Sequence, residues 1–100
     1  MEASLHFLAE TDEPFAQSKA DMERKALLCK RARSRLFQTG TGSVEQRKAE
    51  AETSEEVGQA DDAWIEAVRV FETYKSKRAT HEIVIDVWRS VNAGLRRGNV

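Results

Sequence analysis

A seven-residue apolar rhythm in the second half of the chain most constrains how it can fold. Two series of positions, each spaced by seven residues, carry mostly apolar side chains. The series are Val57, Trp64, Phe71, Arg78, Ile85, Asn92 and Ala60, Ala67, Tyr74, His81, Trp88, Leu95. This spacing is typical of a helix with a coiled-coil-like seam, whose middle is interrupted by an arginine and a histidine. It predicts a long helix over residues 54–93, which Gly94 would end.

Helix breakers are also scarce in the first half, where Pro14 is the one proline and no glycine precedes Gly40. We predict a short helix over residues 4–10 and a long helix over 12–39. Thr11 can cap the long helix, and proline is tolerated in a first turn.

The stretch GTGS at 40–43 predicts a turn. Ser43 and Gln46 fit a capping box, so a helix over 44–51 follows, with a kink or brief break near 51–54.

The segment HEIVIDVW at 81–88 is ambiguous, because its β-branched residues also favour a strand. We predict helix there, since a single strand would have no partner in this chain.

The long first helix carries apolar residues on one side, and the GTGS turn allows the following helices to fold back on it as an antiparallel hairpin. The predicted fold class is therefore all-α: a single helical domain over residues 1–100, built as a long hairpin with a short extra helix.

The carboxyl-terminal part of this hairpin has more apolar surface than one neighbouring helix can cover. We predict that it forms an oligomer interface and that dimerisation completes a four-helix-type bundle. The predicted interface residues are Ile83, Val84, Val87, Trp88 and Val91. The alternative is a three-helix monomer in which residues 1–10 and 44–52 cover this surface.

The stretch RKALLCKRARSR at 24–35 holds six basic residues and no acidic one. At 100° per residue, Arg24, Arg31 and Arg35 form one stripe, with Leu27 and Leu28 close beside it. One hypothesis is a ridge that contacts phosphates, helped by Arg96 and Arg97 near the carboxyl terminus. The other is a solvated face that pairs with the acidic stretch 45–66. The whole chain has 16 basic and 17 acidic residues, a balance that does not favour a dedicated nucleic-acid binder.

Sequence patterns for catalysis or metal binding are incomplete. His81 and Glu82 begin an HExxH pattern, but Ile85 stands where the second histidine is needed. We predict that Cys29 is a small core residue. Because it is the single cysteine, it cannot form an internal disulfide, and this indicates a reducing compartment. We therefore predict no enzyme activity, no cofactor and no metal, and no apolar run is long enough to predict a membrane span.

Three stretches together resemble a family of small helical proteins of tailed bacteriophages and prophages. They are FLAETDEPFAQSKADMER at 7–24, GSVEQRKAEAETSEE at 42–56 and HEIVIDVWRSVNAGLRRGN at 81–99. Genes of this family often lie among phage recombination and replication genes. The resemblance implies an accessory role in phage DNA metabolism and a location in the cytoplasm of the bacterial host. It defines no functional residues.

The expected function is that of a non-enzymatic protein-interaction factor, a homodimer that presents helical faces to a phage or host protein. The contact residues of such a partner would be Arg24, Leu27, Leu28, Arg31 and Arg35, since an apolar pair among arginines suits a protein surface. Two alternatives stay open. One is a direct DNA-binding protein that uses the basic residues. The other is an inhibitor of a host enzyme that mimics DNA with the acidic stretch 45–62.

Overall fold

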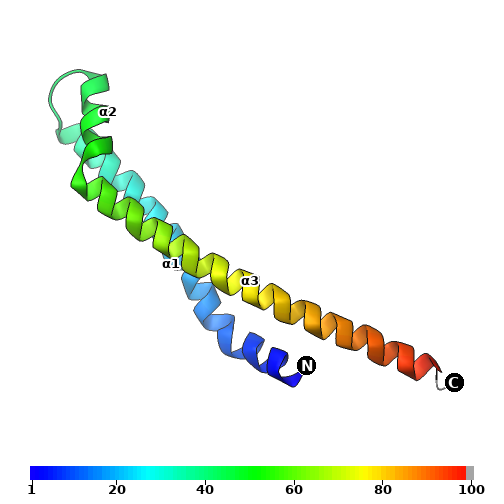
Figure 1. The fold of residues 1–100 in the computed structure, drawn as a ribbon. Helices are drawn as coiled ribbons and strands as arrows, with labels where there is room; N and C mark the ends of the chain where they lie inside the picture. Colours follow the sequence, from blue (N-terminus) through cyan, green and yellow to red (C-terminus); the bar gives the residue numbers. More distant parts are fainter. Residues whose placement is uncertain (99–100) are drawn as a thin grey trace. The chain divides into compact units, whose positions relative to one another are not determined.

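The computed structural model describes residues 1–98, and within them the chain forms three α-helices and no strand (Figure 1). Helix α1 spans Glu2–Thr39, α2 spans Val44–Thr53 and α3 spans Glu55–Gly98. The all-α prediction is confirmed, including the helical state of residues 81–88. The chain divides into two compact units. We call Ser18–Phe71 the hairpin unit, and Met1–Gln17 together with α3 from Glu72 onward the terminal unit.

Helix α1 is a single helix, so the predicted short helix over 4–10 and the new start at 12 are wrong. Thr11 does not cap a helix: its hydroxyl donates to the carbonyl of Phe7 at 2.7 Å, within the helix. Pro14 lies inside α1, where proline removes a backbone hydrogen bond and usually costs about 3 kcal/mol. Contacts from another helix must offset this cost. Arg78 of α3 supplies such contacts on both sides of Pro14, to Thr11 and to Phe15.

The turn between α1 and α2 follows the predicted chemistry. Gly42 has a φ of 100°, a conformation that favours glycine. Ser43 and Gln46 form the capping box: the Ser43 hydroxyl accepts from the Gln46 amide at 3.2 Å, and the Ser43 amide donates to the Gln46 side chain at 3.1 Å. The helix expected over 44–51 therefore begins where predicted and ends two residues later, at Thr53.

The break expected near 51–54 is the single residue Ser54. Its amide donates to the carbonyl of Ala51 at 3.3 Å, and its hydroxyl accepts from the amide of Val57 at 3.2 Å. Ser54 thus ends α2 and caps α3. The hydroxyl of the preceding residue, Thr53, donates back to the carbonyl of Ala49 within α2 at 2.8 Å.

The carboxyl-terminal end of α3 lies beyond Gly94, so the predicted stop at 93 is wrong. A glycine ends a helix when it adopts a positive φ, and in the described chain Gly42 alone among the glycines does so. Arg96 and Arg97 occupy the last turn of α3, where positive charge is favourable.

The core of the hairpin unit is built from small residues. Its buried apolar side chains are Cys29, Ala51, Val57 and Ala67. Helices α1 and α3 run antiparallel here, because Arg33 meets Asp61 while the later residue Arg35 meets the earlier Glu56. Small side chains let the helix backbones approach closely, and Val57 is the largest fully buried side chain.

The terminal unit is held by polar seam residues. His81 stacks on Phe7 with ring centroids 4.3 Å apart, and its Nδ1 lies 2.8 Å from the hydroxyl of the buried Ser4. Arg78 donates to the carbonyl of Leu8 and to Asp12. The two seam interruptions seen in the sequence therefore face α1. Arg78 pairs with the acid Asp12, whereas His81 contacts a hydroxyl.

Candidate functional site

The most enclosed basic residue of the stretch 24–35 is Arg33, which is engaged within the hairpin unit. Its Nε lies 2.7 Å from Glu52 Oε1, and two further nitrogens lie 2.9 and 2.7 Å from the carboxylate oxygens of Asp61. The guanidinium lowers the pKa of Asp61, and hydrogen bonds to Asp61 and Glu52 raise the pKa of Arg33. This pairing agrees with the hypothesis that the basic stretch forms ion pairs with acidic residues of 45–66.

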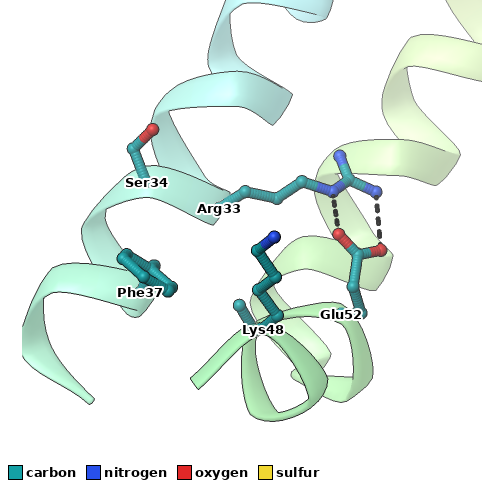
Figure 2. A pocket seen from close by; sticks show the side chains of 6 residues that line it. Arg33, Ser34, Phe37, Lys48 and Glu52 are labelled. Carbon is teal, nitrogen blue, oxygen red and sulfur yellow. Dashed lines mark hydrogen bonds and ion pairs between the residues drawn. The ribbon is translucent and has the colours of Figure 1, made fainter. Parts of the chain in front are cut away.

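Figure 2 shows the pocket beside this pair, with the Arg33 side chain directed at Glu52 rather than into open space. The pocket has a volume of about 340 Å³ and is lined by Arg33, Ser34, Phe37, Lys48, Ala51 and Glu52. Because Glu52 already pairs with the guanidinium, Arg33 is not free to bind a phosphate in this pocket.

Cys29 lies next to the same ion pair and is buried. Burial raises the pKa of its thiol, and the neighbouring Asp61 carboxylate raises this pKa further. A thiol with a raised pKa is mostly protonated near neutral pH and is a poor nucleophile. The prediction that Cys29 is a core residue is confirmed by its burial.

The predicted contact residues on α1 lie on one exposed face of the hairpin unit. Leu27 and Leu28 are 45% and 46% exposed, and Arg24, Arg31 and Arg35 are exposed as well. We call this set the α1 stripe. Arg35 pairs with Glu56 of α3. Within residues 1–98, Arg24 and Arg31 make no ion pair, so their charges face solvent.

A shallow groove between α1 and α3 brings part of the α1 stripe together with residues that sequence reasoning missed. Its volume is about 320 Å³, and it is lined by Leu28, Arg31, Ala32, Arg35, Glu56 and Ala60. Glu56 and Ala60 are one helical turn apart on α3. Their position beside Arg35 depends on how α1 and α3 are aligned, and this alignment depends on where the chain breaks between α2 and α3. The sequence placed this break only approximately, near 51–54, whereas it lies at Ser54.

The predicted oligomer residues of α3 are also exposed. Ile83, Val84, Val87, Trp88 and Val91 range from 42% to 62% exposed, whereas Ile85 between them is buried. Arg96 and Arg97 are exposed in the same unit. The two predicted basic clusters thus belong to different units, since the α1 stripe lies in the hairpin unit.

The described part of the chain contains no group of three His, Cys, Asp or Glu residues placed to hold a metal ion. Across the same residues no helix combines the length and apolar character needed to cross a membrane. No protein-family model, curated protein or solved structure matches this chain.

Proposed function

We propose that this protein is a non-enzymatic interaction factor that binds a partner protein through the α1 stripe and the groove beside it. The observation that carries the proposal is the pair Leu27 and Leu28, each about half exposed, flanked by Arg24 and Arg31, which make no ion pair within residues 1–98. Contact between leucine side chains and water is unfavourable, so burying these leucines against an apolar partner surface would lower the free energy of the complex.

The groove also defines the chemistry of the partner. Leu28, Ala32 and Ala60 supply apolar lining, and Arg31, which makes no ion pair among the described residues, lines the groove as well. An acidic amphipathic helix fits this surface, because its apolar side would cover the apolar lining while a carboxylate meets Arg31.

Direct DNA binding is less well supported by these contacts. Two of the arginines in the basic stretch, Arg33 and Arg35, are already paired with acids. The remaining cations flank leucines, which have no favourable contact with a phosphate backbone. Mimicry of DNA by the acidic stretch is weakened for the same reason, since Glu52, Glu56 and Asp61 are engaged in these pairs.

The biological setting of the proposal rests on the resemblance of three sequence stretches to small phage helical proteins. It places the partner among proteins of phage DNA recombination or replication, within the cytoplasm of the bacterial host. Homodimerisation belongs to the same proposal and is supported by the exposed apolar residues of α3.

The test is affinity capture from phage-infected cells with the full chain, followed by identification of the retained proteins. Parent protein is compared with Leu28→Asp and Arg31→Glu, which alter the groove. The matched control is Lys19→Glu, an equal charge change at an exposed α1 position of the same unit. We expect a protein that the parent and the control retain and that both groove variants lose.

A parallel measurement addresses DNA, using fluorescence anisotropy of a labelled duplex at low and high salt. We expect weak binding that Arg31→Glu leaves unchanged. If no protein depends on the groove, and Arg31→Glu instead abolishes duplex binding whose affinity falls steeply with salt, the chain is a DNA binder and the proposal is wrong.

A further inference from the structure

The last part of α3 is an amphipathic helix whose apolar side has no cover within the described chain. Ile85 is the last buried residue of α3, and up to Gly98 none of the residues that follow is buried. Seen down the helix axis, five exposed apolar residues fall within a wedge of about 100°. We call this wedge the tail face; its residues are Val84, Val87, Trp88, Val91 and Leu95.

The tail face carries no charge at all. Every charged residue between positions 82 and 97 falls on the other side of the helix, and these residues are Glu82, Asp86, Arg89, Arg96 and Arg97. A charged partner therefore finds nothing to pair with on this wedge. What fits is another uncharged apolar helix face.

The spacing along the tail face is that of a coiled-coil seam. Val84, Trp88, Val91 and Leu95 are separated by four, three and four residues. Large and small side chains alternate along it, with valine at the first and third positions and a larger residue at the second and fourth. An identical antiparallel helix would set Trp88 against Val91 of the other copy, and Leu95 against Val84. A parallel copy would instead set Trp88 against Trp88.

Charge along the tail favours the same orientation. Both acidic residues, Glu82 and Asp86, precede Trp88, whereas the three arginines follow it. These charges point away from the tail face, so they interact only weakly across a pair. An antiparallel pair still places the acidic half of each copy beside the basic half of the other, whereas a parallel pair places like charges at the same level.

We propose that the tail face binds the tail face of a second copy in antiparallel orientation, with Trp88 of each copy packed against Val91 of the other. This pairing covers the apolar residues that α1 leaves exposed. It rests on the homodimerisation part of the proposed function and names its surface and orientation. It is separate from the binding of another protein, because the tail face and the α1 stripe share no residue and lie in different units.

The first test is the oligomeric state of the full chain by sedimentation velocity and light scattering. We expect a dimer, and we expect Val91→Glu to weaken it roughly 100-fold or more, since a carboxylate would be buried without a partner. The matched control is Ala93→Glu, the same new charge on the opposite side of the same exposed helix. A monomeric parent, or equal effects of the two variants, would overturn the proposal.

The second test fixes the orientation by disulfide formation in a Cys29→Ala background. Single variants Val84→Cys and Leu95→Cys are oxidised separately and as a mixture. The antiparallel pair predicts cross-linked dimers in the mixture alone, because each cysteine lies opposite the other position. Cross-linking of each variant by itself indicates a parallel pair and would overturn the proposed orientation. Neither test involves the groove, so failure here leaves the outcome of the capture experiment unaffected.

Discussion

The hairpin unit and the terminal unit are built from the same two long helices, yet different forces hold them. The hairpin unit buries four apolar side chains and keeps its ion pairs at the surface. Among the described residues of the terminal unit, Ile85 is the one buried apolar residue, and the central contact is made by a cation, Arg78, whose side chain is 13% exposed. Apolar packing thus dominates in the hairpin unit, and the polar contacts of Arg78 and His81 dominate in the terminal unit.

This difference explains where apolar surface remains. In the hairpin unit α3 lies beside α1, and its residues Val57 and Ala67 are buried. In the terminal unit the amino-terminal residue Ser4 already lies opposite His81, and α3 continues to Gly98. Between Ile85 and Gly98 no residue of α3 is buried, so the apolar side chains of this stretch stay exposed within the described chain.

The largest expected effect is at the apolar core of the hairpin unit. Val57 is 1% exposed, so Val57→Asp buries an unpaired carboxylate. We expect it to lower the free energy of unfolding by about 4 kcal/mol, measured by urea unfolding followed by circular dichroism. The control Ile65→Asp, at a position 58% exposed on the same helix, should change this free energy by less than about 0.5 kcal/mol. Equal losses would mean that Val57 is not the centre of a core.

The next effect tests the polar seam of the terminal unit. Arg78→Met keeps the aliphatic stem but removes the hydrogen bonds to Leu8, Thr11 and Asp12. We expect a loss of about 2 kcal/mol in unfolding free energy. Hydrogen exchange should rise most around Pro14, since Thr11 and Asp12 lie in the helical turn before the proline.

Two control variants locate the source of the Arg78 effect. Lys77→Met, at an exposed neighbouring position, should leave stability nearly unchanged. Asp12→Asn should cost less than about 1 kcal/mol, because the Asp12 side chain is 70% exposed. A loss from Asp12→Asn as large as that from Arg78→Met would show that the ion pair, rather than the contacts with Leu8 and Thr11, holds the seam.

The ion pair of Arg33 and Asp61 in the hairpin unit should make the stability of the protein depend on pH. Arg33 lowers the pKa of Asp61 below its ordinary value of 3.8, so the folded chain binds this proton less readily than the unfolded chain. The resulting stability is present above that value and is lost as pH falls through the lowered pKa. We expect urea midpoints to fall more between pH 5 and pH 3 for the parent than for Arg33→Gln. The Glu66–Arg69 pair is present in both proteins and cancels in this comparison.

The smallest effect compares one glycine from each unit. Gly58 and Gly94 both lie inside α3, and no atom lies within 4 Å of an added Cβ at either position. Gly58→Ala should raise the free energy of unfolding by roughly 0.5 kcal/mol, because helix packing depends on that segment. Gly94→Ala should increase helical content while leaving the unfolding midpoint of the monomer unchanged. A shifted midpoint for Gly94→Ala would show that the tail packs within its own chain.

The comparison also shows which parts of the site were predictable. The seven-residue rhythm placed Val57, Arg78, His81 and Ile85 correctly at inward-facing positions, but it also included Trp64, Trp88 and Leu95, which are exposed. The stripe of Arg24, Arg31 and Arg35 with two leucines followed from helix geometry alone. Glu56 and Ala60, which complete the groove, were not found, because they depend on the register between α1 and α3. Dimerisation stays a prediction, to be settled by the sedimentation experiment.

The sequence by itself determined the helical class, the capping box at Ser43 and the apolar periodicity, because these depend on residues within one or two helical turns of each other. Tertiary structure alone decided that α1 continues through Pro14 and that Arg33 pairs with both Asp61 and Glu52. Those outcomes depend on side chains from a distant helix: Arg78 spans the proline, and Asp61 and Glu52 reach Arg33. Local propensity sets what a segment can form, and contacts across the pair of helices select what it does form.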